Sequence, residues 1–240
     1  MIRFLSIDID GCLNHGTNTK PNRRKLQEIR DILAFKKDQF SFSLNSGRDV
    51  KYVRRYAQLL SCNSPLVCEN GGILYYPSTD NIKVHPRITP NYIDEICTLE
   101  KSITNDISQM YPGYILEKGK LTMISLNPPT GIPITNFYTD ISSYIAYNFD
   151  AFAVTRSASA VDISLKNINK NEGLRIILAD FKVKYSEVCA IGDSINDLVV
   201  LKQVRYPACP KNADDQVKTI SKYIATKDYE DGVLEILSRI

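Results

Sequence analysis

Residues 2–11 read Ile-Arg-Phe-Leu-Ser-Ile-Asp-Ile-Asp-Gly, a nearly continuous apolar run that ends in two aspartates and a glycine. Such a run is typical of a strand that is buried on both faces, as in a parallel sheet. Aspartate and glycine directly after a strand favour a turn, so the chain is expected to leave the sheet here. The stretch therefore predicts an α/β protein with this strand in its core.

Strands and helices alternate on either side of a different middle section. The expected order is a helix opened by Pro21, a strand over 40–44, a helix over 50–60 and a strand over 65–68, and later a helix over 171–181, a strand over 188–191 and helices over 196–203, 213–223 and 232–240. This alternation is typical of a Rossmann-like parallel sheet covered by helices on both faces. We therefore predict a three-layer α/β core.

From residue 81 the pattern becomes helix-strand-strand, repeated twice. A long helix with apolar residues at 93, 96, 103 and 107 precedes strand-like runs at 114–117 and 121–126, and a helix over 134–147 precedes runs at 152–155 and 161–165. This order predicts a small antiparallel sheet backed by two helices, an α+β insert. We therefore predict a discontinuous core domain, residues 1–80 and 167–240, and an inserted cap domain, residues 81–166.

The composition excludes several classes of protein. The chain has 240 residues, of which 43% are hydrophobic and 24% charged, as in an average folded protein rather than a disordered one. Its net charge of +3 is far below that of a dedicated nucleic-acid binder. No apolar run is long enough for a membrane span, and Asp8 interrupts the N-terminal run too early for a signal peptide. We expect a soluble cytoplasmic protein without nucleic-acid or membrane partners.

The six cysteines lie far apart, without a Cys-x-x-Cys pair, and the chain has only two histidines. A zinc site is therefore not expected. The simplest interpretation is six reduced thiols that are mostly buried. We assign no role to His15 and His85, which lie in loop-like sequence.

Four polar clusters follow predicted strands or open a predicted helix: Asp8-x-Asp10-Gly11, Ser46-Gly47-Arg48, Lys170, and Gly192-Asp193-Ser194-Ile195-Asn196-Asp197. Each cluster alone has an ordinary explanation as a turn, a helix cap or a solvated residue. In an open parallel sheet, however, the carboxyl ends of the strands meet at one edge, where ligands bind. We therefore expect the four clusters to form one site.

Four carboxylates at one edge would repel one another strongly without a cation. Mg²⁺ fits a site made of carboxylate oxygens, and it usually keeps a substrate phosphate as a partner. Ser46 supplies a hydroxyl and Lys170 a cation that suit a phosphate group. The residues alone thus favour a magnesium site, formed by Asp8, Asp10, Asp193 and Asp197, next to a phosphate site.

These four motifs, and the order in which they occur along the chain, resemble those of the haloacid dehalogenase-like hydrolase superfamily. The insert between the second and third motifs resembles the class IIB cap of that superfamily. In its length and its ending Tyr229-Glu230-Asp231-Gly232-Val233, the chain is most similar to the archaeal-type phosphoglycolate phosphatases. It departs from the pattern at Cys12, where the family usually has threonine, and in lacking the methionine often found after the fourth motif.

The resemblance implies a role for each motif. Asp8 would be the nucleophile that forms an aspartyl-phosphate, and Asp10 would protonate the leaving alcohol and then activate water. Lys170 would neutralise charge shared by the phosphate and the nucleophile. Ser46 and the backbone amide of Gly47 would bind phosphoryl oxygens, Asn196 would assist them, and the remaining aspartates would complete the Mg²⁺ site.

Substrate specificity is expected to come from the cap, with Arg156 and the core residue Arg48 as candidate contacts. The implied function is a Mg²⁺-dependent phosphatase for a small phosphorylated metabolite, such as phosphoglycolate or a sugar phosphate. Two alternatives stay open: a phosphotransferase or phosphomutase using the same site, and a non-catalytic phosphate-binding protein. The chain is expected to be a monomer or a homodimer.

Overall fold

The apolar run at the N-terminus forms an interior strand of a parallel sheet. In the computed structural model, which describes residues 1–16, 19–157 and 159–240, five parallel strands lie in the order β12-β11-β10-β1-β2. They span β1 (Phe4–Ile7), β2 (Ser41–Leu44), β10 (Val188–Ile191), β11 (Tyr206–Cys209) and β12 (Tyr223–Ile224). β1 pairs with β2 on one side and with β10 on the other, and all four of its residues are buried. The predicted buried strand is confirmed.

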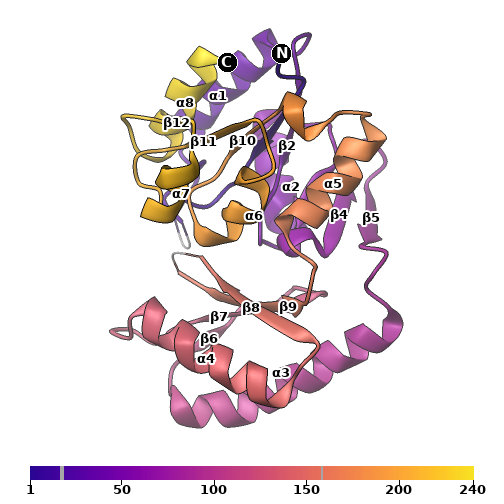
Figure 1. Ribbon diagram of the computed structural model, residues 1–240, viewed down its shortest axis with the longest axis vertical. Coiled ribbons are helices and arrows are strands. Elements are labelled where there is room, and N and C mark those ends of the chain that lie inside the picture. Colours follow the sequence, from indigo (N-terminus) through magenta and orange to yellow (C-terminus); the bar gives the residue numbers. More distant parts are fainter. Residues whose placement is uncertain (17–18, 158) are drawn as a thin grey trace.

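Helices cover both faces of this sheet (Figure 1). One face packs against α1 (Arg23–Phe35), α2 (Val50–Leu60) and α8 (Tyr229–Arg239), and the other against α5 (Lys170–Asp180), α6 (Leu198–Leu201) and α7 (Asp215–Ile220). The helices bury the apolar stripes that the sequence showed, such as Leu26, Ile29 and Leu33 of α1. The three-layer α/β core is therefore confirmed.

A small antiparallel sheet adjoins the parallel one. It has the order β3-β4-β5, with β3 (Leu66–Cys68), β4 (Ile73–Tyr76) and β5 (Asn81–Val84). The sequence predicted a strand over 65–68 within the parallel sheet, but β3 pairs antiparallel with β4 and meets the end of β2 through a single parallel bridge, Asn45 with Val67. The tight turn Glu69–Gly71 (η1) reverses the chain after β3, which produces this antiparallel pairing.

A four-stranded antiparallel sheet, in the order β6-β7-β9-β8, lies below the core (Figure 1). Its strands are β6 (Ile115–Leu116), β7 (Met123–Asn127), β8 (Phe152–Arg156) and β9 (Val161–Leu165). α3 (Pro90–Met110) and α4 (Ile134–Asn148) pack on the face that points away from the core and share a separate apolar cluster with it. The repeated helix-strand-strand order is therefore confirmed.

The division of the chain at residues 80 and 166 stays a prediction. β5, at the start of the predicted cap, pairs with β4 of the small sheet beside the core. The apolar cluster of α3, α4 and their sheet is separate from the clusters of the parallel sheet, which supports an independent packing unit. We use "cap" below for the four-stranded sheet with α3 and α4.

The later part of the core differs from the sequence prediction in its short elements. The helix expected over 196–203 is a 3-10 turn, Ile195–Asp197 (η3), followed by the single-turn α6, and the helix expected over 213–223 covers only α7. β11 and β12 were not predicted, since one is four residues with a proline and the other only two residues. All six cysteines are unpaired and five are buried, as expected.

Within the described residues, no helix combines the length and the apolar character that a membrane crossing requires.

Gly71 allows η1 to lie directly against the start of α5. Its φ is +97°, and a Cβ atom placed on it would lie 2.1 Å from the carbonyl oxygen of Asn169. Asn169 caps α5, because its side chain accepts hydrogen bonds from the backbone N–H groups of Asn171 and Glu172. The first residue of that helix is Lys170, so this close approach fixes the position of a predicted site residue.

We expect Gly71→Ala to destabilise the protein by more than Gly113→Ala. Both glycines have positive φ, but a Cβ on Gly113 would meet nothing within 4 Å. Gly113→Ala should cost about 1–2 kcal/mol for the left-handed backbone, and Gly71→Ala should add about 1–3 kcal/mol for the forced displacement of α5. Urea unfolding of the two variants measures the difference; equal losses would show that the contact with Asn169 is unimportant.

Candidate active site

A buried lysine lies between two carboxylates at the carboxyl end of β1. The Lys170 Nζ is 3.0 Å from Asp8 Oδ2 and 2.7 Å from Asp197 Oδ1. Asp8 directly follows β1, Lys170 begins α5 and Asp197 lies in η3. Lys170 is only 1% exposed, and both carboxylates are buried. The structure therefore brings three predicted site residues from distant parts of the chain into direct contact.

Asp197 has most of its hydrogen-bonding capacity occupied within the protein. Its Oδ2 accepts the backbone N–H groups of Asp193 at 3.1 Å and Ser194 at 3.0 Å, while its Oδ1 accepts from Lys170. The carboxylate of Asp193, by contrast, accepts only a long 3.8 Å contact from the thiol of Cys12 among the residues that the structure describes. Asp197 thus organises the loop after β10, and Asp193 keeps its carboxylate available for another partner.

The cluster carries more negative than positive charge. Burial, with the nearby charge of Asp197, raises the pKa of Asp8 to about 8, and burial likewise raises the pKa of Asp193. Burial alone would lower the pKa of Lys170, but Asp197 and Asp8 outweigh it and raise that pKa. Lys170 therefore stays protonated, and a further cation would relieve the remaining repulsion between the carboxylates.

The donor set fits a hard divalent cation. One carboxylate oxygen from each of Asp8, Asp193 and Asp197 lies within 4.8 Å of the others. Buried carboxylate oxygens without a full set of hydrogen-bond donors are the ligands that Mg²⁺ prefers. Asp8 and Asp193 accept fewer hydrogen bonds than Asp197, so they are the two residues of this set that would hold the ion most directly.

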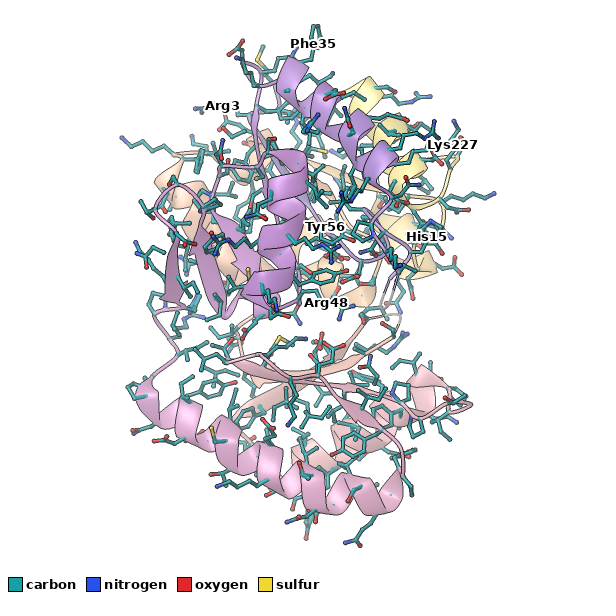
Figure 2. The ribbon with its side chains drawn as sticks, turned by 180° about the vertical axis from the view of Figure 1, so that it is seen from behind. Arg3, His15, Phe35, Arg48, Tyr56 and Lys227 are labelled. Atoms are coloured by element: carbon teal, nitrogen blue, oxygen red, sulfur yellow. The ribbon has the colours of Figure 1, made fainter. Side chains whose placement is uncertain are left out.

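The side chain of Asp10 is directed away from this set. Its Oδ2 accepts from Arg48 Nε at 2.6 Å and its Oδ1 from the Tyr52 hydroxyl at 3.0 Å. Although burial would lower the pKa of Arg48, its hydrogen bond to Asp10 raises it. Arg48 also contacts Glu117 of the cap, with 3.2 Å between Nη1 and Oε1. Figure 2 shows Arg48 at the end of the core that faces the cap sheet.

The predicted phosphate-binding residues lie around the same cavity. Ser46 is buried after β2, and its Oγ accepts the backbone N–H of Arg48 at 3.3 Å. Asn196 lies in η3, and its Oδ1 accepts from the Ser194 hydroxyl at 2.6 Å. Both residues, together with Gly47, line the cavity that contains Asp8.

This cavity, of about 170 Å³, lies between the core and the cap. The described residues that line it from the core are Asp8, Asp10, Gly11, His15, Gly16, Ser46, Gly47, Arg48, Lys170, Asp193, Ser194, Asn196, Asn212 and Tyr229, and those from the cap are Glu117, Lys120, Ser157, Ser159, Ala160 and Asp162. Arg156 ends β8 and is not among them, so its predicted contact with the substrate stays a prediction.

Sequence reasoning missed the cap residues Glu117, Lys120 and Asp162. Lys120 is almost completely buried, 3.0 Å from Glu117 Oε2. A glutamate and a lysine three residues apart around a turn are common on protein surfaces, so the sequence carried only a weak signal for this pair. His15, which received no role, stacks on Tyr229 with ring centroids 4.1 Å apart and borders the cavity.

A family model for haloacid dehalogenase-like hydrolases matches residues 5–127 and 130–237, almost the whole chain. Among curated relatives, phosphoglycolate phosphatase 1 of Saccharolobus solfataricus is 26% identical, and the match covers all of this chain and 96% of that protein. The phosphoglycolate phosphatase of Thermoplasma volcanium is 23% identical over 99% of this chain and 98% of its own length.

Solved structures show the same fold. A protein of Thermoplasma acidophilum matches with a TM-score of 0.72 and 21% identity, over 100% of this chain and 98% of that one. The sucrose-phosphatase of Synechocystis, solved with sucrose and phosphate, matches with a TM-score of 0.74 and 15% identity, over the same shares of the two chains. Both structural matches extend over the cap as well as the core.

We expect the affinity of the protein for Mg²⁺ to increase with pH. Because the pKa of Asp8 is raised to about 8, the metal-free folded protein holds a proton there that the unfolded chain has lost. The free energy of unfolding of the metal-free protein should therefore fall as pH rises toward 8. Below pH 8, Mg²⁺ must displace the proton on Asp8 in order to bind, which weakens its apparent affinity. The apparent affinity should drop about fiftyfold from pH 8 to pH 6, since the proton on Asp8 is half dissociated at pH 8 and almost fully bound at pH 6.

Calorimetric titration of Mg²⁺ at pH 6 and pH 8, with the melting temperature at each pH, measures this effect. Asp38→Asn, which changes an exposed carboxylate, should behave as the unchanged protein does. Equal affinity at the two pH values would mean that no proton on Asp8 competes with the ion.

Proposed function

Because the chain belongs to the haloacid dehalogenase-like hydrolases, we propose that it is a Mg²⁺-dependent phosphatase that cleaves a small organic phosphate monoester through an aspartyl-phosphate. The observation that carries this proposal is the buried Asp8–Lys170–Asp197 contact beside a cavity between core and cap. A simple phosphate-binding protein needs no carboxylate at the centre of an anion site, because a carboxylate repels phosphate.

Asp8 is the group positioned to attack phosphorus. One oxygen is held by Lys170, and the other accepts the backbone N–H of Ile9 at 2.7 Å, so the carboxylate has a fixed orientation. Its oxygen forms a bond to phosphorus while the bond from phosphorus to the alcohol oxygen breaks. The Lys170 ammonium offsets the charge that the phosphate brings next to Asp8.

Asp10 is the group positioned to move protons. Two residues beyond the nucleophile, it borders the cavity and is oriented by Arg48 and Tyr52. In its protonated form it donates a proton to the departing alcohol oxygen. It then accepts a proton from the water that attacks the phosphorus of the aspartyl-phosphate, which releases inorganic phosphate and restores Asp8.

The remaining residues bind the phosphate and the ion. The Ser46 hydroxyl and the Gly47 amide would contact phosphoryl oxygens, assisted by Asn196, which lines the same cavity. Asp8 and Asp193 would hold Mg²⁺, with Asp197 fixing the loop that carries Asp193. When bound, Mg²⁺ supplies positive charge that screens the phosphate from the carboxylates and aligns it with the nucleophile.

The substrate is proposed to be a small phosphorylated metabolite, either phosphoglycolate or a sugar phosphate, in the cytoplasm. The curated relatives named phosphoglycolate phosphatase support the first choice, and the structural likeness to a sucrose-phosphatase adds only the fold. Transfer of the phosphoryl group to an added alcohol instead of water would reveal the phosphotransferase alternative, and product analysis distinguishes the two.

We expect Asp8→Asn to abolish phosphate release from p-nitrophenyl phosphate in the presence of Mg²⁺. The amide is nearly the same size as the carboxylate but cannot form an acyl-phosphate. Excess chelator should abolish the phosphatase activity of the unchanged protein, and added Mg²⁺ should restore that activity. Turnover of Asp8→Asn within a few-fold of the unchanged protein, or full activity in excess chelator, would overturn the proposed function.

We expect Lys170→Ala to lower turnover by a factor on the order of 10²–10³ for every ester tested, because it removes one preorganised electrostatic group at the transferring phosphate. Lys166→Ala is the matched control, since Lys166 is exposed and pairs with the exposed Asp150. Circular dichroism checks that Lys170→Ala is folded. A folded Lys170→Ala variant that reorders the substrates would place Lys170 in recognition instead.

A further inference from the structure

The cap forms a roof of charged side chains over the phosphate site. Glu117, Lys120 and Asp162 line the cavity from the cap, opposite Asp8 and Lys170 in the core. Asp162 is 4% exposed, and the side chains of Glu117 and Lys120 are 14% and 4% exposed. Since the phosphate lies at the core side, this roof faces the part of the ester that leaves as an alcohol.

Each positive group at the roof already has a carboxylate partner. Lys120 Nζ lies 3.0 Å from Glu117 Oε2 and donates to the Ser125 hydroxyl. Arg48, which reaches the roof from the core, contacts Asp10 at 2.6 Å and Glu117 at 3.2 Å. A carboxylate on the substrate would therefore have to compete with existing ion pairs for either cation.

The two roof carboxylates are held by neighbouring donors, and both line the cavity. Although burial would raise the pKa of Glu117, Lys120 and Arg48 lower it, so this side chain is ionised near neutral pH. Asp162 accepts from the Ser125 hydroxyl through Oδ1 and from Asn70 Nδ2, at 3.0 Å, through Oδ2. A carboxylate oxygen has room for further donors beyond one hydrogen bond.

These contacts discriminate between leaving groups. A carboxylate would meet the charges of Glu117 and Asp162, and an ammonium group would meet Lys120 and Arg48. A hydroxyl can donate to a carboxylate and accept from a cation without disturbing either ion pair. Because Arg48 also pairs with Asp10 of the core, the charged groups here are three carboxylates and two cations, and their net charge disfavours a further carboxylate.

We propose that the roof selects phosphate esters whose leaving group carries hydroxyls, with Glu117 and Asp162 accepting those hydroxyls. This inference rests on the proposed phosphatase activity and names the class of substrate for that site: polyol or sugar phosphates in preference to phosphoglycolate. It would separate this chain from the relatives whose name is phosphoglycolate phosphatase.

Three esters of nearly equal size test the choice: 2-hydroxyethyl phosphate, phosphoglycolate and phosphoethanolamine, which end in a hydroxyl, a carboxylate and an ammonium group. The kcat/KM of the unchanged protein should be at least about tenfold higher for the hydroxyl ester than for either charged ester. A tenfold difference is what one hydrogen bond to a charged group contributes. A preference for either charged ester overturns the proposal.

Glu117→Gln and Asp162→Asn should each lower the ratio of kcat/KM for 2-hydroxyethyl phosphate to that for phosphoglycolate by about tenfold, because each removes a charge that attracts the hydroxyl and repels the carboxylate. The ratio is independent of how much of a preparation is folded. Glu100→Gln is the matched control, a half-buried cap carboxylate that pairs with Lys118 and does not line the cavity, and should leave the ratio unchanged. A ratio unmoved in both roof variants overturns the proposal.

Hydrolysis of p-nitrophenyl phosphate separates this inference from the function beneath it. If p-nitrophenyl phosphate is cleaved with Mg²⁺ and Asp8→Asn is inactive, the phosphatase function stands. A preference for a charged ester over 2-hydroxyethyl phosphate then overturns only the proposed selectivity of the roof. If neither p-nitrophenyl phosphate nor any of the three esters is cleaved, the phosphatase function fails, and the inference fails with it.

Discussion

The Lys170 ammonium between the carboxylates of Asp8 and Asp197 is the interaction on which the arrangement of the site depends. Removing one partner from a buried ion pair costs about 3–5 kcal/mol of folding free energy. The folded state therefore requires Asp8, Lys170 and Asp197 to be in place at the same time. The start of α5 and the loop after β10 are therefore both held at the carboxyl end of β1. The amide of Asn45, which donates to the Lys170 carbonyl at 3.1 Å, and the close approach at Gly71 support this placement.

The excess negative charge of this cluster would couple the binding of the proposed Mg²⁺ to the binding of a phosphate group. One ammonium cannot balance three buried carboxylates. Burial, together with the nearby charge of Asp197, therefore raises the pKa of Asp8 and of Asp193. Asp197 is satisfied by backbone N–H groups and Lys170, so the demand for a cation falls on the other two. A divalent ion bound there turns a region that repels anions into one that accepts phosphate.

Polar contacts, rather than a shared apolar core, connect the cap to the core at the site. The buried Glu69 of η1 accepts from the backbone N–H groups of Leu121 and Thr122, at 3.0 Å and 2.7 Å, and thereby holds the segment next to the roof lysine. Arg48 links Asp10 to Glu117 across the same boundary. The cap and the core therefore pack as separate apolar units that are joined by polar contacts at the site.

The sequence by itself determined the buried first strand, the helices on both faces, the repeated order of the cap and the meeting of Asp8, Lys170 and Asp197, because apolar periods are local and parallel strands end at one edge. Only the tertiary structure decided that Asp10 turns toward the core arginine and that Glu117 faces the cavity. It also decided the antiparallel pairing of β3 and the short strands β11 and β12. These features depend on side-chain direction and on contacts between segments far apart in the chain, which no local pattern encodes.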